Sequence, residues 1–317
     1  MPLPRILTLA LLALLTAIPP VRAQTPAKAP AKAPASLAPD TATLKVATRL
    51  VAVSAIARDK SGQPIANLTR DDFLLKQDGK PQPITYFSQG NTLPLTLALM
   101  VDTSGSQRAY IPYEIAAGRA FFPAMLTRTD DRAVLVQFDS TILQLVKLTP
   151  SVTTLVHGLG YLTQQHYGIG TPGGGGTLLF DAICAVAHME LGTQIGRRAM
   201  VILTDGGDNG SRFGQKDAIR EAQRADIMIY TVYYSDGGGD EGALKDLSRQ
   251  TGGREFTVGP TSTLQQIYAS IAADLRQSYE LGYRPPDTRP NKYHKIDLKA
   301  TNKDLSVQAR DGYYTPK

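Results

Sequence analysis

The sequence lacks most of the residues on which disulfide, zinc and histidine chemistry depend. Its 317 residues include one cysteine, no tryptophan and four histidines. The single cysteine, Cys184, excludes an internal disulfide and a paired-cysteine zinc or redox site. We expect this cysteine to be buried as a small apolar side chain, with a reactive or intermolecular thiol as the alternative.

Catalytic motifs are absent as well. None of the histidines has the His-x-x-x-His or Glu-x-x-His spacing of a metal site. No Gly-x-Ser-x-Gly elbow is present, and the glycine-rich stretch at 170–176 lacks the Gly-Lys-Ser/Thr of a phosphate-binding loop. We therefore expect a protein that is not an enzyme.

The positive charge is small once the N-terminal segment is set aside. The net charge is +6, but residues 1–43 contain four of the 34 cations and one of the 28 anions. The remaining 274 residues therefore have a net charge of only +3. No cluster of Lys and Arg with interleaved aromatic residues appears, so we do not expect a nucleic-acid partner.

Long apolar runs are also scarce, and the one of note lies at the N-terminus. Arg5 precedes an apolar stretch at 6–18, and Val21-Arg22-Ala23 forms a small-residue cleavage pattern. This pattern predicts a signal peptide over 1–23, with an uncleaved anchor as the alternative. A Pro/Ala/Lys linker follows over 24–43. We expect an exported, periplasmic or extracellular protein whose mature chain has no transmembrane segment.

Strands and helices alternate over residues 93–277. Continuous apolar runs, typical of strands buried on both faces, lie at 93–102, 133–138, 199–203 and 227–232. A shorter run at 142–146 predicts an antiparallel edge strand. Helical stripes separate these runs, and Thr261 or Ser262 is a candidate N-cap for the last helix. The pattern predicts an α/β fold with a doubly wound, mostly parallel sheet.

The two flanks of this region have strand character. Residues 44–92 and 278–317 both show alternating apolar residues separated by turn signals. Neither flank is long enough for a robust core of its own, but together they have the size of a small β-sandwich. We therefore predict that the α/β region is inserted into one discontinuous β-sandwich. The alternative is two separate β-appendages.

Five oxygen-bearing side chains follow the predicted strands at positions where a ligand site is expected. They are Asp102, Ser104, Ser106, Thr177 and Asp205. Loops at the carboxyl ends of strands converge in a doubly wound sheet, so we expect these side chains to meet. An oxygen-only site selects hard cations, which makes Mg²⁺ the first choice, with Ca²⁺ or Mn²⁺ as alternatives.

These residues, in this order, resemble the metal-ion-dependent adhesion site of the von Willebrand factor A domain, with its pattern DxSxS…T…DG. The resemblance covers residues 93–277 and implies that Ser104, Ser106 and Thr177 are direct or near-direct metal ligands. The flanks are similar to bacterial secreted proteins described as VWFA-related, common in Acidobacteria. That second resemblance carries information on architecture more than on function.

The resemblance implies a binding module. The expected function is metal-dependent protein binding, in which the cation docks an Asp or Glu of a protein partner. The alternative is a structural scaffold subunit of an envelope assembly, with a metal that is not used for ligand capture. The loops at 164–170 and 207–212 either shape partner choice or are ordinary solvated loops. The oligomeric state stays open.

Overall fold

The computed structural model describes residues 50–316, except 90–91, 163–175 and 236–237. The predicted signal peptide and linker lie outside the described residues, so both stay predictions. No helix in the described part has the length and apolar character needed to cross a membrane.

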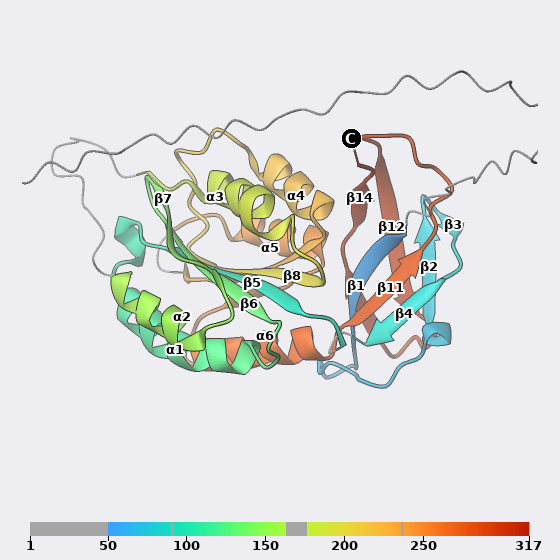
Figure 1. The fold of residues 1–317 in the computed structure, drawn as a ribbon, viewed down its shortest axis with the longest axis horizontal. Coiled ribbons are helices and arrows are strands. Elements are labelled where there is room, and N and C mark those ends of the chain that lie inside the picture. Colours follow the sequence, from blue (N-terminus) through green and yellow to red (C-terminus); the bar gives the residue numbers. More distant parts are fainter. Residues whose placement is uncertain (1–49, 90–91, 163–175, 236–237, 317) are drawn as a thin grey trace, which may run out of the picture. The chain divides into compact units, whose positions relative to one another are not determined.

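A six-stranded sheet forms the centre of the α/β region, with the order β10-β9-β8-β5-β6-β7 (Figure 1). The strands are β5 (Leu95–Asp102), β6 (Arg132–Phe138), β7 (Ile142–Thr149), β8 (Arg197–Thr204), β9 (Ile227–Tyr233) and β10 (Glu255–Thr257). Neighbouring strands are parallel, except that β7 pairs antiparallel with β6 at the sheet edge. The mostly parallel sheet and its antiparallel edge strand are therefore as predicted.

Helices cover both faces of this sheet, which explains why its central strands are continuously apolar. Side chains alternate along a strand, so Leu97 and Leu99 of β5 pack in one core while Ala98 and Met100 pack in the other. The first core includes α1 (Ile111–Met125), α2 (Val152–Gly158) and α6 (Leu264–Arg276), and the second includes α3 (Leu179–Val186), α4 (Gln215–Arg224) and α5 (Glu241–Thr251) (Figure 1). The doubly wound α/β fold is confirmed.

Two local predictions need correction or addition. The N-cap of α6 is Thr263, not Thr261 or Ser262: its hydroxyl accepts from the Gln266 amide, and its own amide donates to the Gln266 side chain in a capping box. Helix α2 was not predicted, since its seven residues are too short to show a clear period. Its N-terminus is capped by Ser151, whose hydroxyl accepts a hydrogen bond from the Thr154 amide at 3.2 Å. Short helical turns complete the region: η3 (Gly105–Gln107), η4 (Leu159–Tyr161) and the π-helical η5 (Ala187–Leu191).

The two flanks form two antiparallel sheets, and each sheet contains strands from both flanks. One sheet has the order β13-β1-β11-β4, and the other has the order β14-β12-β2-β3. The N-terminal flank supplies β1 (Val51–Arg58), η1 (Arg70–Asp72), β2 (Phe73–Gln77), β3 (Lys80–Pro81) and β4 (Tyr86–Gln89). The C-terminal flank supplies β11 (Tyr279–Tyr283), β12 (Tyr293–Ala300), β13 (Ser306–Ala309) and β14 (Gly312–Tyr314).

One apolar core joins the two flank sheets. Val53 pairs with Leu281 in the first sheet and Leu75 pairs with Leu298 in the second, and all four side chains belong to the same buried cluster. The flanks therefore form one discontinuous β-sandwich, and the alternative of two separate appendages is wrong.

Two buried arginines hold α6, and one of them, Arg58, ties the sandwich to the α/β region. The Arg58 guanidinium of β1 lies 2.5 Å from the Asp274 carboxylate of α6, and both side chains are almost fully buried. Arg197 of β8 donates to the backbone oxygen of Leu275, also in α6. The last helix of the α/β region is thus held from two sides where the chain enters β11.

Candidate metal site

The candidate site lies where the order of the central sheet reverses. Strand β5 has β6 on one side and β8 on the other, and the chain continues outward from each. Asp102 is the last residue of β5, Phe138 pairs with it at the end of β6, and Thr204 ends β8 one step beyond the pair Val101–Leu203. The three carboxyl ends therefore meet at the crevice where ligands bind in doubly wound sheets.

Asp102 is fully buried at this crevice and is held by both of its carboxylate oxygens. The Ser104 amide donates to Oδ1 at 2.9 Å, and the Thr204 hydroxyl donates to Oδ2 at 2.6 Å. Burial raises the pKa of Asp102 to about 6, and the charge of Asp205 adds to the rise, although the two hydrogen bonds lower it in part. Asp102 is thus a rigidly held carboxylate whose charged form would be stabilised by a nearby cation.

Ser104 and Ser106 present their hydroxyls beside Asp102. Ser104 is the N-cap of η3, and its Oγ lies 3.2 Å from Oγ of Ser106. Two neighbouring oxygen ligands of an octahedral ion at about 2.1 Å are about 3.0 Å apart. The spacing of the two serine oxygens therefore fits adjacent positions on a small divalent cation.

Asp205 faces the site from the loop after β8 and is 4% exposed. Its Oδ1 accepts a hydrogen bond from the Gly207 amide at 2.9 Å. The loop at 238–240 packs so closely against it that a Cβ on Gly239 would lie 2.1 Å from the Asp205 backbone oxygen. Glycine at 239 is thus needed for this close approach, which fixes the turn that bears Asp205.

Thr177 reaches the same edge of the sheet but is held by a different neighbour. Its amide donates to Oδ1 of Asn209 at 2.7 Å, and the Asn209 amide donates to the Thr177 backbone oxygen at 3.3 Å. The next residue, Leu178, donates to the backbone oxygen of Asp139 after β6. Among the described residues, no hydrogen bond joins Thr177 to the other four predicted site residues. The predicted loop at 164–170 lies outside the described residues.

The structure gives Asp208 a role in the local fold. Its Oδ1 accepts hydrogen bonds from the Ser211 hydroxyl at 2.6 Å and from the Phe180 amide at 3.3 Å. Phe180 lies in the first turn of α3, whose leading amides have no partner within the helix. Asp208 therefore fixes the 207–212 loop against the start of α3.

Sequence reasoning missed several buried polar residues behind the site, which include a glutamate on α1. Glu114 is 1% exposed, and neither of its carboxylate oxygens makes a hydrogen bond of normal geometry within the described residues. Burial raises the pKa of Glu114 to about 8, the nearby Tyr234 hydroxyl lowers it in part, and the charge of Asp102 raises it further. The sequence did carry a signal for its burial, because Glu114 lies three residues after Ile111 and three before Ala117, on the buried face of α1.

Other buried side chains of the α/β region also have atoms without a regular hydrogen bond. The side-chain amide of Gln107 and the hydroxyls of Tyr234 and Tyr268 make no hydrogen bond of normal geometry within the described part of the chain. Gln107 lies in η3, Tyr234 directly follows β9, and Tyr268 lies in α6. Buried polar groups of this kind are suited to contacts with internal water.

Two other features could have supported chemistry: the single cysteine and clusters of metal-binding side chains. Cys184 is 7% exposed, and burial raises the pKa of its thiol to about 12, so the prediction of a buried, unreactive cysteine agrees with the structure. Over the described residues, no group of three or more His, Cys, Asp or Glu side chains is placed to hold a metal ion. A metal at the β5–β8 edge would thus depend on the serine and threonine hydroxyls as well as on the two carboxylates.

Comparison with known proteins bears on the α/β region. The sequence model of the von Willebrand factor type A domain matches residues 97–270. No curated protein matches the chain significantly.

Similar solved structures have low identity to the chain. The vWF domain of the type V pili tip protein Mfa5 from Porphyromonas gingivalis is 17% identical, with 57% of this chain and 94% of that chain covered and a TM-score of 0.43. A von Willebrand factor type A protein from Catenulispora acidiphila is 9% identical, with 86% and 74% covered and a TM-score of 0.49. Proximal thread matrix protein 1 from the mussel byssus, with a zinc-occupied MIDAS motif, is 14% identical, with 63% and 49% covered and a TM-score of 0.49. Because the family model spans more than half of the sequence, the protein belongs to the von Willebrand factor type A domain family.

Proposed function

We propose that the protein is an exported, non-enzymatic binding module that docks an acidic side chain of a protein partner through a divalent cation. The observation that carries this proposal is the pair of serine hydroxyls 3.2 Å apart beside the buried, doubly hydrogen-bonded carboxylate of Asp102. Asp102, Ser104, Ser106, Thr177 and Asp205 would hold the ion, with Mg²⁺ as the first choice and Ca²⁺ or Mn²⁺ as alternatives.

The types of residue explain why such a site would bind a partner. Hydroxyl ligands are neutral, so a bound divalent ion keeps enough positive charge to attract a further carboxylate. Ser106 and Gly105 are exposed, which leaves the approach from solvent open on the side of η3. Asp102 and Asp205 are buried beneath, where they orient hydroxyls or bound water rather than compete with the partner's carboxylate.

Metal binding is tested by calorimetry of Mn²⁺ and Mg²⁺ with a matched pair of serine variants. We expect Ser106→Ala to weaken Mn²⁺ binding at least tenfold. Ser140→Ala should leave it unchanged, because Ser140 is an exposed serine of the neighbouring loop after β6 and is not a proposed ligand. Equal affinities of the two variants would contradict the assignment.

Partner docking needs a separate measurement, since a bound metal need not capture a ligand. With Mn²⁺ present, a peptide that contains one Glu should bind, and the same peptide with Gln should not. EDTA or Ser106→Ala should abolish binding of the Glu peptide. If metal binds but neither peptide does, and if native partners from an envelope extract survive chelation, the scaffold function is favoured instead.

A further inference from the structure

A cavity lies between the α/β region and the β-sandwich, at the opposite end of β8 from Asp205. Its volume is about 230 Å³, below the range of about 300–1,000 Å³ typical of drug-sized ligands, so it suits a smaller group. The charged lining residues are three arginines, Arg198, Arg224 and Arg310, and one aspartate, Asp226. The cavity therefore has an excess of positive charge.

Arg310 is the most buried of the three arginines and is held rigidly. It is 7% exposed, and its Nη1 donates to the Gln223 backbone oxygen at 2.8 Å and lies 3.1 Å from Asp226 Oδ1. Its Nη2 donates to the backbone oxygen of Ala52 in β1. The carboxylate of Asp226 is therefore paired with Arg310. The Nε atom of Arg310 is buried and has no partner among the described residues.

Arg198 is the arginine whose charge is left without compensation. It is half-buried near the start of β8, its Nε is buried without a partner, and no ion pair engages it in the described part of the chain. Its neighbour Arg197, by contrast, donates to the backbone oxygens of Leu93 and Leu275. A buried cationic N–H group without an acceptor is costly, so an anion or water is expected to fill this position.

Arg224 completes the cationic side of the cavity. Its Nη2 donates to Asn291 Oδ1 at 2.6 Å, and its guanidinium lies 5.2 Å from the ring centre of Tyr314. Glu221 is 3.5 Å away and compensates Arg224 in part. The apolar and aromatic part of the lining consists of Val51, Pro285, Tyr313, Tyr314 and Pro316.

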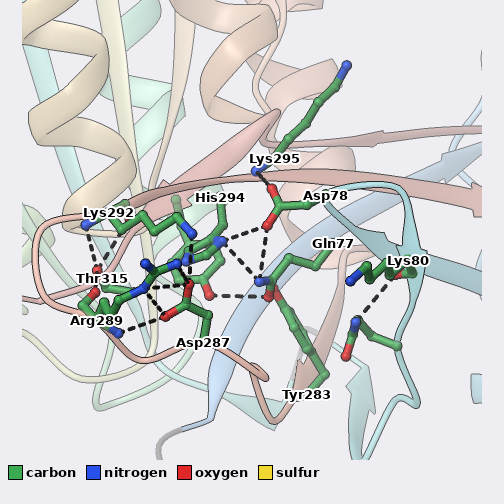
Figure 2. Close-up of polar contacts among 12 residues, drawn as sticks. Gln77, Asp78, Lys80, Tyr283, Asp287, Arg289, Lys292, His294, Lys295 and Thr315 are labelled. Atoms are coloured by element: carbon green, nitrogen blue, oxygen red, sulfur yellow. Dashed lines mark hydrogen bonds and ion pairs between the residues drawn. The ribbon is translucent and has the colours of Figure 1, made fainter.

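The loop that contains Pro285 and Thr288 borders the cavity, and its carboxylate, Asp287, pairs with cations of the same loop. Figure 2 shows Asp287 between Arg289 and Lys292, which lie 2.6 and 2.7 Å from its Oδ2. These cations hold the pKa of Asp287 well below its usual range. The Lys292 amide also donates to the Thr315 hydroxyl at 2.8 Å, which pins the loop to the strand end after β14 (Figure 2). The wall is thus already formed, and Asp287 is already paired.

We propose that this cavity binds a carboxylate carried on an apolar body of about the size of one amino-acid residue. The guanidinium of Arg198 would take the carboxylate, because a planar fork of N–H groups matches its two oxygens. The tyrosine and proline walls would pack on the apolar body. The site shares none of the five proposed metal ligands, so it stands whether or not the metal site functions.

The test is calorimetry of the full chain in EDTA with N-acetyl-L-phenylalanine as the probe. We expect this acid to bind, and its primary amide and inorganic phosphate to bind at least tenfold more weakly. Arg198→Gln should weaken binding of the acid at least tenfold. Arg119→Gln, which removes an exposed arginine of α1, should not change it.

Several outcomes would overturn the proposal. They are equal affinity for the acid and its amide, phosphate binding as tight as that of the acid, and no loss on Arg198→Gln. If Arg198→Gln fails to fold, Arg198→Lys replaces it, and the acid should still bind more weakly because the charge remains without the fork. A tetrapeptide with C-terminal phenylalanine then separates two supporting results: binding indicates a peptide terminus as ligand, and its absence indicates a free small acid.

Discussion

Two buried glutamines, Gln77 in the β-sandwich and Gln107 in the α/β region, have opposite hydrogen-bonding surroundings. In the β-sandwich, Gln77 is 2% exposed, and its Oε1 accepts hydrogen bonds from the hydroxyls of Tyr283 at 2.7 Å and Tyr313 at 3.3 Å. Its Nε2 lies 3.0 Å from Nδ1 of His294, which in turn lies 2.7 Å from Asp78 (Figure 2). In the α/β region, Gln107 is fully buried, and neither atom of its amide has a partner in the described chain.

The same difference in hydrogen bonding holds for other buried polar groups of the two regions. In the sandwich network, only Nε2 of His294 is left without a partner among the described residues. In the α/β region, the buried atoms without a regular hydrogen bond among the described residues include those of Gln107, Glu114, Tyr234 and Tyr268. Buried polar groups without partners lower stability, so proteins tolerate them mainly at functional sites. The comparison thus teaches that polar groups stabilise the sandwich, whereas behind the candidate metal site they are retained at a cost.

The largest expected effect comes from replacing each glutamine with leucine. Gln77→Leu leaves two buried tyrosine hydroxyls without an acceptor, so we expect it to lower the free energy of unfolding by roughly 2–4 kcal/mol. Gln107→Leu removes an amide that has no protein partner, so its effect should lie within about 0.5 kcal/mol of zero or be stabilising. Urea unfolding in EDTA measures both. Equal losses in the two variants would show that the regions do not differ.

A smaller effect is expected from the buried glutamate. The pKa of Glu114 is raised from 4.5 to about 8 in the folded protein, so the folded state retains a proton that the unfolded state loses between these values. Its stabilising contribution is therefore complete below about pH 4.5 and is lost as the pH rises towards 8. Glu114→Gln should reduce the loss of stability between pH 5.5 and pH 7 by about 2 kcal/mol.

The control for this experiment is Glu190→Gln, a glutamate of η5 that is not buried. It should follow the wild-type pH dependence in urea unfolding with EDTA present. A wild-type slope in Glu114→Gln would mean that Glu114 titrates normally and that the buried cluster behind the site is less costly than its lack of partners indicates.

Much of the fold could be predicted from the sequence, because a strand that is buried on both faces of a sheet has a continuous run of apolar residues. The continuous apolar run at β5 and the turn signals of the flanks were sufficient to predict the sheet and the inserted arrangement. Asp102 and Asp205 could be placed at the site because strand ends are visible in the sequence.

Contacts that depend on the register between strands could not be predicted. The bond from Thr204 to Asp102 exists because Val101 pairs with Leu203, and nothing local to either residue specifies this pairing. The arginine cavity likewise joins residues 198, 224 and 310, which only the packing of the sandwich on α4 brings together. The contact between Asn209 and Thr177 could not be predicted either, because the two residues lie 32 positions apart in the sequence.

The smallest expected effect concerns Thr204, whose hydroxyl gives the metal edge a satisfied buried bond like those of the sandwich. Thr204→Val keeps the volume but removes the donor to Asp102 and the acceptor for the Gly206 amide, which should lower the free energy of unfolding by about 1–2 kcal/mol. Loss of this bond also raises the pKa of Asp102 above its value of about 6, because the bond stabilises the charged form.

In Thr204→Val, a proton therefore competes more strongly with a bound cation at Asp102. Mn²⁺ affinity at pH 6 should fall by about fivefold if this pKa rises by one unit, and at pH 8 it should change little. Thr141→Val, in the neighbouring loop, is the control, and an equal loss of Mn²⁺ affinity at both pH values would show that Thr204 acts on the shape of the site rather than on the charge of Asp102.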